Sequence, residues 1–159
     1  MSVAFTKEGD SEAFAADLPD RPISPHPNLV TPEGLAALEQ ALAAARAAYA
    51  AAQAAGDIAA DRTAMARATR DLRYYGARRG SAQLVDPPRG DGVVRFGSRV
   101  RLEAEDGTAL AYRIVGEDES DPAQGLVAYI APMARALIGR MAGDTVTVAG
   151  RELEIVGVE

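Results

Sequence analysis

The chain has 159 residues and carries 23 Asp and Glu against 17 Lys and Arg, a formal net charge of −6 at pH 7 that excludes a free-standing nucleic-acid-binding protein. It contains no cysteine, which excludes disulfides, thiolate zinc sites and cysteine nucleophiles. The chain is 48% hydrophobic, has no apolar run of membrane-spanning length and begins with a polar, acidic stretch unlike a signal peptide, so we expect a globular cytoplasmic protein with no membrane contact.

Residues 1–28 are predicted to form an extended or disordered arm. The stretch LPDRPISPHPN contains four prolines, and proline lacks a backbone N–H and disfavours helix in the residue before it. His26, the only histidine, lies between two of these prolines. A base or metal ligand needs partner residues, and the sequence offers none nearby. We therefore interpret His26 as an exposed loop residue.

Residues 29–86 are predicted to form an antiparallel helical hairpin. Thr31 can cap a helix that begins at Pro32. Apolar residues then recur three and four positions apart in two segments separated by Gly56-Asp57, and two such seams of similar length fold back on each other. The first seam comprises Leu35, Leu38, Leu42, Ala45, Tyr49 and Ala52, and the second comprises Met65, Ala68, Leu72, Tyr75 and Ala82.

The second helix of this hairpin is rich in arginine. Such a run is ordinarily a solvated helix face. A stripe that faces phosphates or acidic groups is the alternative, because every one of these cations is Arg rather than Lys. We favour the solvated face and keep the alternative open. The arginines are Arg62, Arg67, Arg70, Arg73, Arg78 and Arg79.

Residues 87–159 are predicted to form a small α+β domain, with a boundary at the DPPRGDG stretch of Asp86–Gly92. Beyond it, apolar and polar residues alternate with the period of a strand, as at Val100 and Leu102. Asp106-Gly107 is a turn signal between two antiparallel strands. The pattern predicts an antiparallel sheet.

One short helix interrupts the strands of this domain. Pro132 can open it, and Met133, Leu137 and Ile138 would then fall on one face, with Gly139 at its end. The sheet has few aromatic residues with which to close its own core. We therefore expect the helix to cover the open face of the sheet.

Several motifs resemble the bacterial transcript-cleavage factors GreA and GreB. In the last third they are Phe96-Gly97, Tyr112-Arg113-Ile114-Val115-Gly116 and Pro132-Met133-Ala134-Arg135-Ala136-Leu137. LVTPEG, from Leu29, is similar to the start of the family's first helix, and AQLVD, from Ala82, to the end of its second. The resemblance implies an α+β fold in which a coiled-coil hairpin precedes an FKBP-like antiparallel β domain with one short helix. It implies no isomerase activity, because function belongs to sites rather than folds.

The resemblance also implies that the partner is RNA polymerase. In this family the C-terminal domain docks at the mouth of the polymerase's secondary channel and the hairpin enters it, so contact with nucleic acid is indirect. Such a factor is not itself an enzyme and has no cofactor of its own, because the polymerase holds the catalytic Mg²⁺. The sequence agrees, since it offers no nucleophile–base pair and no phosphate loop. The implied polymerase-binding residues are Ser120, Asp121, Pro132, Met133, Ala134 and Arg135.

The hairpin tip departs from the family pattern G-D-x-x-E-N-A-E-Y, whose acidic residues help to hold the metal. This chain reads GDIAADRTAM, so Asp57 matches the aspartate, Ala60 replaces the glutamate and Asp61 replaces the asparagine. Asp57 and Asp61 are the candidate metal-binding residues. Asp57 suits a helix cap better than a metal ligand, and both helical arms look shorter than in GreA and GreB by roughly two turns, or about 10 Å.

Three interpretations of function follow from the sequence. The first is a GreA/GreB-like factor that binds RNA polymerase at the secondary channel and modulates elongation with weak or no stimulation of transcript cleavage. The second is an active cleavage factor that uses Asp57 and Asp61. The third is a regulator of another protein, like the short-hairpin relatives known as nucleoside diphosphate kinase regulators. Co-purification with core polymerase would separate the first two from the third.

Overall fold

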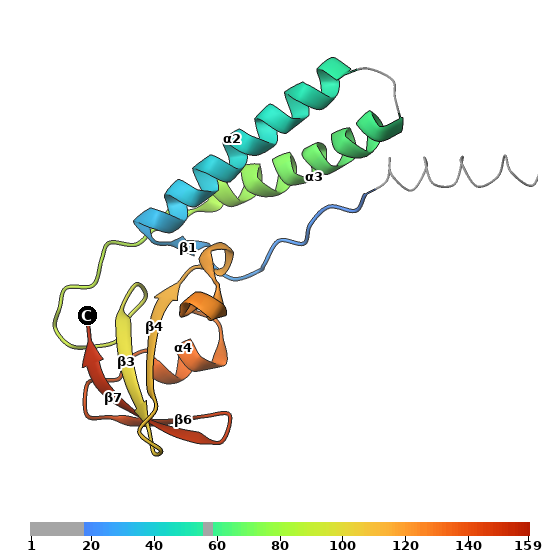
Figure 1. The fold of residues 1–159 in the computed structure, drawn as a ribbon. Helices are drawn as coiled ribbons and strands as arrows, with labels where there is room; N and C mark the ends of the chain where they lie inside the picture. Colours follow the sequence, from blue (N-terminus) through green and yellow to red (C-terminus); the bar gives the residue numbers. More distant parts are fainter. Residues whose placement is uncertain (1–17, 56–58) are drawn as a thin grey trace, which may run out of the picture. The chain divides into compact units, whose positions relative to one another are not determined.

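The computed structural model describes residues 18–55 and 59–159, without the side chains of residues 59–61. Contacts between residues divide the chain into two compact units. Figure 1 shows their helices and strands, coloured along the sequence. Of the described residues, the hairpin unit comprises 18–26, 36–55 and 59–81, and the β unit comprises Pro27–Leu35 together with Ala82–Glu159. The units therefore divide at 35/36 and 81/82, whereas the predicted boundary was at 86–92. The reason is that the segments just before and just after the hairpin pair with each other, Leu29 with Gln83, and so belong to the β unit.

Two long helices build the hairpin. Helix α2 spans Pro32–Ala55 and helix α3 spans Ala59–Ser81, and they run antiparallel (Figure 1). Most of the first predicted seam is buried, and Ala68 is the fully buried member of the second. The predicted hairpin is therefore confirmed. The buried seam residues of α2 are Leu38, Leu42, Ala45 and Ala52. No helix in the described ranges has the length and apolar character needed to cross a membrane.

The start of α2 has the predicted cap. The Thr31 hydroxyl accepts a hydrogen bond from the Gly34 N–H at 3.0 Å, and it donates one to the Glu119 carboxylate. Thr31 is only 1% exposed, so water cannot replace either partner. One hydroxyl therefore satisfies a helix N-terminus and a carboxylate at once.

Replacing Thr31 with Val should lower the free energy of unfolding by about 1–2 kcal/mol, because the shape remains but the cap and the partner of Glu119 are lost. Thr31→Ser keeps the hydroxyl and is the matched control. The measurement is denaturant unfolding followed by circular dichroism. Equal stability of the Val and Ser variants would show that the hydroxyl contributes nothing.

The β unit contains two sheets. A short one pairs β1 with β2 in parallel, Leu29 opposite Gln83 and Val30 opposite Leu84. The main sheet has five strands in the order β5-β4-β3-β7-β6. The strands are β1 (Leu29–Val30), β2 (Gln83–Leu84), β3 (Arg99–Ala104), β4 (Ala109–Val115), β5 (Leu126–Ala128), β6 (Thr145–Val148) and β7 (Arg151–Val158).

The main sheet confirms the predicted strands but is not wholly antiparallel. Its β3–β4, β3–β7 and β6–β7 pairs are antiparallel, and β5 pairs in parallel with β4. Parallel neighbours need a connection that crosses back, and here two short 3₁₀ turns, Glu117–Glu119 and Pro122–Gln124, provide it. The acidic stretch GEDESDPAQG, residues 116–125, is therefore the crossover that leads to the edge strand β5.

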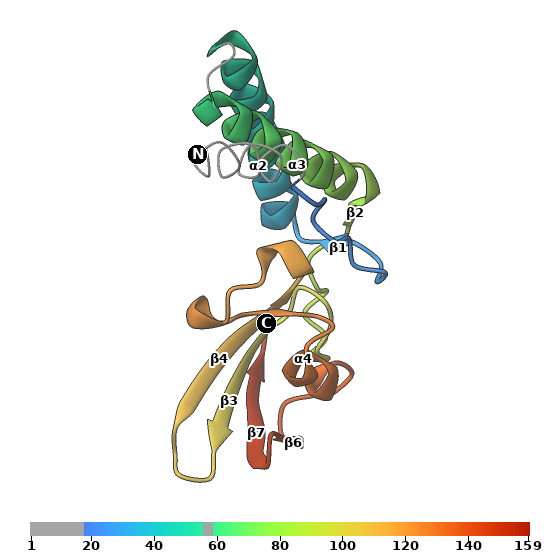
Figure 2. The same ribbon diagram turned by 90° about the vertical axis from the view of Figure 1, so that its right-hand side faces the viewer.

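Helix α4, Pro132–Leu137, completes the core as predicted. It packs against β5 and β6, and Figure 2 shows it beside the sheet. The side chains of Ala134 and Leu137 are 0% exposed and join the buried alternate residues of β3, Val100 and Leu102. Ile138 was predicted on the same face but is 40% exposed, because the helix ends at Leu137 and the backbone of Ile138, with ψ at 129°, is no longer helical.

Candidate functional site

The predicted docking residues Ser120 and Asp121 lie in the crossover before β5. The Asp121 N–H donates to the Leu126 carbonyl at 2.9 Å, and the Leu126 N–H returns a bond of 3.0 Å to Asp121. The Ser120 hydroxyl donates to the same Leu126 carbonyl at 3.5 Å. In the described part of the chain, no hydrogen bond or ion pair holds the Asp121 carboxylate. Its backbone is thus fixed while its charge stays available.

The other predicted docking residues lie in α4, the helix that follows β5 in the chain. Pro132 and Arg135 are exposed, whereas Met133 is half-buried against the core and Ala134 is fully buried. A buried alanine contacts no partner, so Ala134 positions the helix instead. The predicted docking residues that can meet another molecule are thus Ser120 and Asp121 before β5 and Pro132 and Arg135 after it, and we call these four residues the β5 surface.

A second polar cluster, which the sequence did not reveal, joins the crossover to the start of α2. Arg113 of β4 binds Glu33 at 3.1 Å, and Glu119 accepts from Thr31. The backbone N–H at the helix start, and then the Arg113 guanidinium, lower the pKa of the Glu33 carboxyl. Gly116 leaves room for the Leu29 carbonyl, which a Cβ there would meet. These contacts all lie within the β unit and fix β1 beside the crossover.

At least three of the six arginines of α3 form ion pairs with acidic residues in the described part of the chain. Arg70 binds Asp71 at 3.3 Å, Arg73 binds Asp20 at 3.1 Å and Arg79 binds Glu39 at 3.0 Å. Arg62 and Arg78 also have interaction partners, and Arg67 is exposed. For the arginines other than Arg78, this pattern supports the solvated, ion-paired face over the phosphate-facing stripe. Arg78 is a correction to that prediction, because its side chain is buried, at only 2% exposed. His26 is exposed as expected, and its N–H donates to the Ser24 hydroxyl at 3.2 Å.

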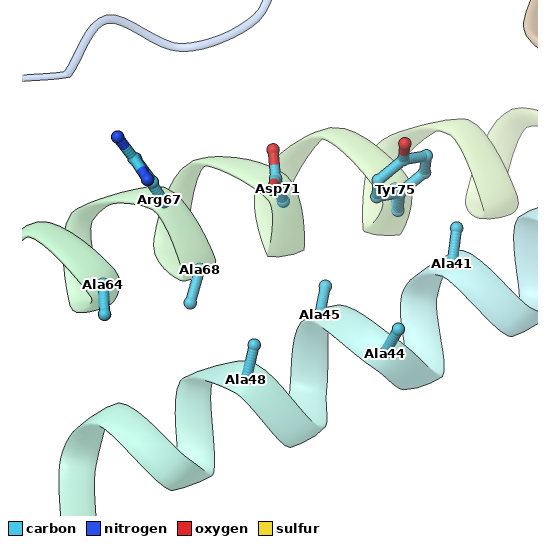
Figure 3. Close-up of a pocket in the computed structure, with 9 residues that line it drawn as sticks. All are labelled: Ala41, Ala44, Ala45, Ala48, Ala64, Arg67, Ala68, Asp71 and Tyr75. Atoms are coloured by element: carbon cyan, nitrogen blue, oxygen red, sulfur yellow. The ribbon is translucent and has the colours of Figure 1, made fainter. Parts of the chain in front are cut away.

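A shallow groove of about 510 Å³ runs between α2 and α3 (Figure 3). Figure 3 shows alanines of the two helices facing each other across it, such as Ala45 and Ala68. Its polar residues, Arg67, Asp71 and Tyr75, all come from α3. The groove follows from packing with small side chains.

The two candidate metal residues are not tested by the structure. Asp57 lies outside the described residues, and Asp61 lies in α3 with its side chain outside them. In the described part of the chain, no group of three or more His, Cys, Asp or Glu side chains could hold a metal ion. The metal-binding role of Asp57 and Asp61 stays a prediction.

Comparison with known proteins finds a family match within the β unit. Residues 89–159 match the family model "Transcription elongation factor, GreA/GreB, C-term". The chain is 51% identical to transcription elongation factor GreA of Alkalilimnicola ehrlichii over 85 residues, which are 49% of this chain and 54% of that protein. With GreA of Desulfovibrio desulfuricans the identity is 40% over 109 residues, or 64% of this chain and 65% of the relative.

A GreB is similar as well. The chain is 44% identical to transcription elongation factor GreB of Yersinia pestis over 80 residues, or 50% of this chain and 47% of that protein. The chain thus spans about half the length of most of these relatives. Among solved structures, GreA factor homolog 1 of Thermus thermophilus is 20% identical, with a TM-score of 0.41 over 84% of this chain and 99% of that one.

Proposed function

We propose that this chain acts as a GreA/GreB-like factor, because its residues 89–159 match the C-terminal domain of that family. It binds bacterial RNA polymerase at the secondary channel and modulates transcription elongation. We propose further that it stimulates transcript cleavage weakly or not at all. The observation that carries the proposal is the match of the whole β unit beyond Arg89 to the family's C-terminal domain.

The β5 surface supports polymerase docking. It combines a carboxylate, Asp121, and an exposed guanidinium, Arg135, on backbones that are held by hydrogen bonds. Rigid, oppositely charged groups lose little entropy on binding and can each meet a complementary charge on a partner. The protein contributes a surface rather than a reaction, so the chemistry would remain that of the polymerase.

The hairpin tip supports the weak or absent stimulation of cleavage. Ala60 stands where the family has a glutamate, and alanine offers no oxygen to a hard cation. The arms also look shorter than those of GreA and GreB. A carboxylate several ångströms from its ion contributes nothing to the coordination of magnesium.

Replacing both Asp121 and Arg135 with Ala should weaken binding to core RNA polymerase at least about tenfold, equivalent to ~1.4 kcal/mol. Arg135 is exposed, and Asp121 is half-buried with no partner for its carboxylate in the described part of the chain, so the circular dichroism spectrum should not change. The matched control is Arg99→Ala with Glu103→Ala, which removes one charge of each sign from exposed positions of β3. The measurement is a titration with labelled protein.

Equal binding by the two double variants would remove the β5 surface from consideration. If the natural chain itself did not bind core polymerase, the proposed function would be wrong, and a regulator of another protein would become the better interpretation. Cleavage is a separate measurement, because binding can occur without it.

A further inference from the structure

The end of the N-terminal arm is clamped onto α3. The guanidinium of Arg21 lies 3.8 Å from the ring centroid of Tyr74 and 5.1 Å from that of Tyr75. It also pairs with Asp71 at 3.6 Å. Cation–π contact with two rings and an ion pair therefore converge on one side chain.

A second contact lies next to this clamp. Asp20 pairs with Arg73 at 3.1 Å, but both side chains are about two-thirds exposed, at 62% and 67%. Ion pairs so open to water are screened by salt and add little. Arg21 and Asp71 are better covered, at 37% and 34%. The attachment of the arm to α3 thus depends mainly on Arg21.

The far end of this segment is fixed independently. The Tyr129 hydroxyl donates to the Pro27 carbonyl at 2.6 Å, and Leu29 pairs with Gln83 in the β unit. From Arg21 to Leu29 the chain can extend for about 27 Å, whereas α3 rises only about 9 Å from Tyr75 to its end at Ser81. The connection has slack, so the clamp at Arg21 can open without separating β1 from β2.

We propose that residues 18–26 are an autoinhibitory strap: Arg21 closes it over the Tyr74–Tyr75 face of α3, and its opening frees that face for a partner. The proposal rests on the proposed function, in which the hairpin enters a channel of the polymerase. A hairpin that carries the strap is thicker along α3 and hides two tyrosines. The partner then has to displace Arg21. The apparent affinity is the affinity of the open form multiplied by the fraction of chains that are open.

Closure can be measured in the free full-length protein. The chain has no cysteine, so a nitroxide on Pro19→Cys, an exposed position before the clamp, labels one site only. In the otherwise natural chain it should broaden the amide NMR signals of α3 between Asp71 and Arg78. Arg21→Gln should remove most of this broadening, and Arg21→Lys should keep part of it.

Two controls make the closure test decisive. Arg46→Gln changes an exposed arginine of α2 and should leave the broadening intact. Isotope-labelled chain without the cysteine, mixed with unlabelled nitroxide chain, should show none. Broadening in the mixture would mean that a second copy is bound instead, and persistent broadening in Arg21→Gln would mean that Arg21 is not the clamp. Either result overturns the strap.

Inhibition is measured as affinity for core RNA polymerase. If nine chains in ten are closed, Arg21→Gln should bind about tenfold more tightly than the natural chain, and Arg46→Gln should bind equally. Equal or weaker binding by Arg21→Gln would overturn the inhibitory role. If no variant bound, the proposed function and the inhibitory role would both be wrong, while the NMR result would still decide whether the strap exists.

Discussion

Replacing Leu137 with Ala should lower the free energy of unfolding of the β unit by about 3 kcal/mol. The Leu137 side chain is 0% exposed and lies in the core with Ile114 and Ile155. Removing it takes away apolar burial and leaves a cavity, because α4 packs against both β5 and β6 and cannot collapse inward freely.

Leu84→Ala is the matched control for this prediction. The Leu84 side chain is 53% exposed, and the same truncation there should cost less than about 0.5 kcal/mol. Since the chain forms two compact units, the measurement should report on the β unit alone, for example by hydrogen exchange of the Ile114 and Ile155 amides. Equal costs at the two positions would contradict a core closed by α4.

Local patterns predicted this part of the fold well. Alternation at Val100 and Leu102 gave β3 its buried face, and Pro132 with Leu137 gave α4 its start and its core contact. Both signals depend on residues a few positions apart, where backbone geometry alone relates sequence to burial. The prediction failed at Ile138, which is exposed because the helix ends before it and the helical period no longer applies.

Long-range contacts could not be predicted from the same patterns. Nothing in the local sequence pairs Glu33 with Arg113, or places Arg21 on Tyr74. The arm was predicted to be extended or disordered, and its described end does lack regular structure, but prolines cannot reveal that one arginine has a docking position on a helix. Likewise, the crossover that makes β5 parallel is fixed by tertiary packing.

The candidate docking residues show the same difference between what the sequence predicts and what only the tertiary structure reveals. Ser120, Asp121, Pro132 and Arg135 were identified through resemblance, and the structure leaves all four accessible to some degree. Ala134 belonged to the same motif but is buried. A motif combines residues that meet a partner with residues that hold the backbone, and only burial separates the two.

The natural chain should bind core polymerase yet leave the rate of RNA cleavage in backtracked complexes at the level of the polymerase alone. The tip reads GDIAADRTAM, with Ala60 in place of the family's glutamate. Magnesium needs several oxygens at about 2.0–2.1 Å, and one carboxylate held short of the ion supplies none. A chain that occupies the same site without supplying the tip should also inhibit a full-length cleavage factor by competition.

Ala60→Glu alone should not rescue cleavage, because the reach of the hairpin would be unchanged. Inserting one heptad in each helical arm keeps both seams in register and adds about 10 Å. Combined with the acidic tip, this variant should raise the cleavage rate at least about tenfold, a barrier change of ~1.4 kcal/mol. The heptad insertion without the acidic tip is the control for length. Cleavage is followed over a range of magnesium concentrations, since a better-held ion should act at lower magnesium. If the natural chain cleaved efficiently and Asp57→Asn abolished that activity, the hairpin would reach the ion unaided, and the protein would be an active cleavage factor.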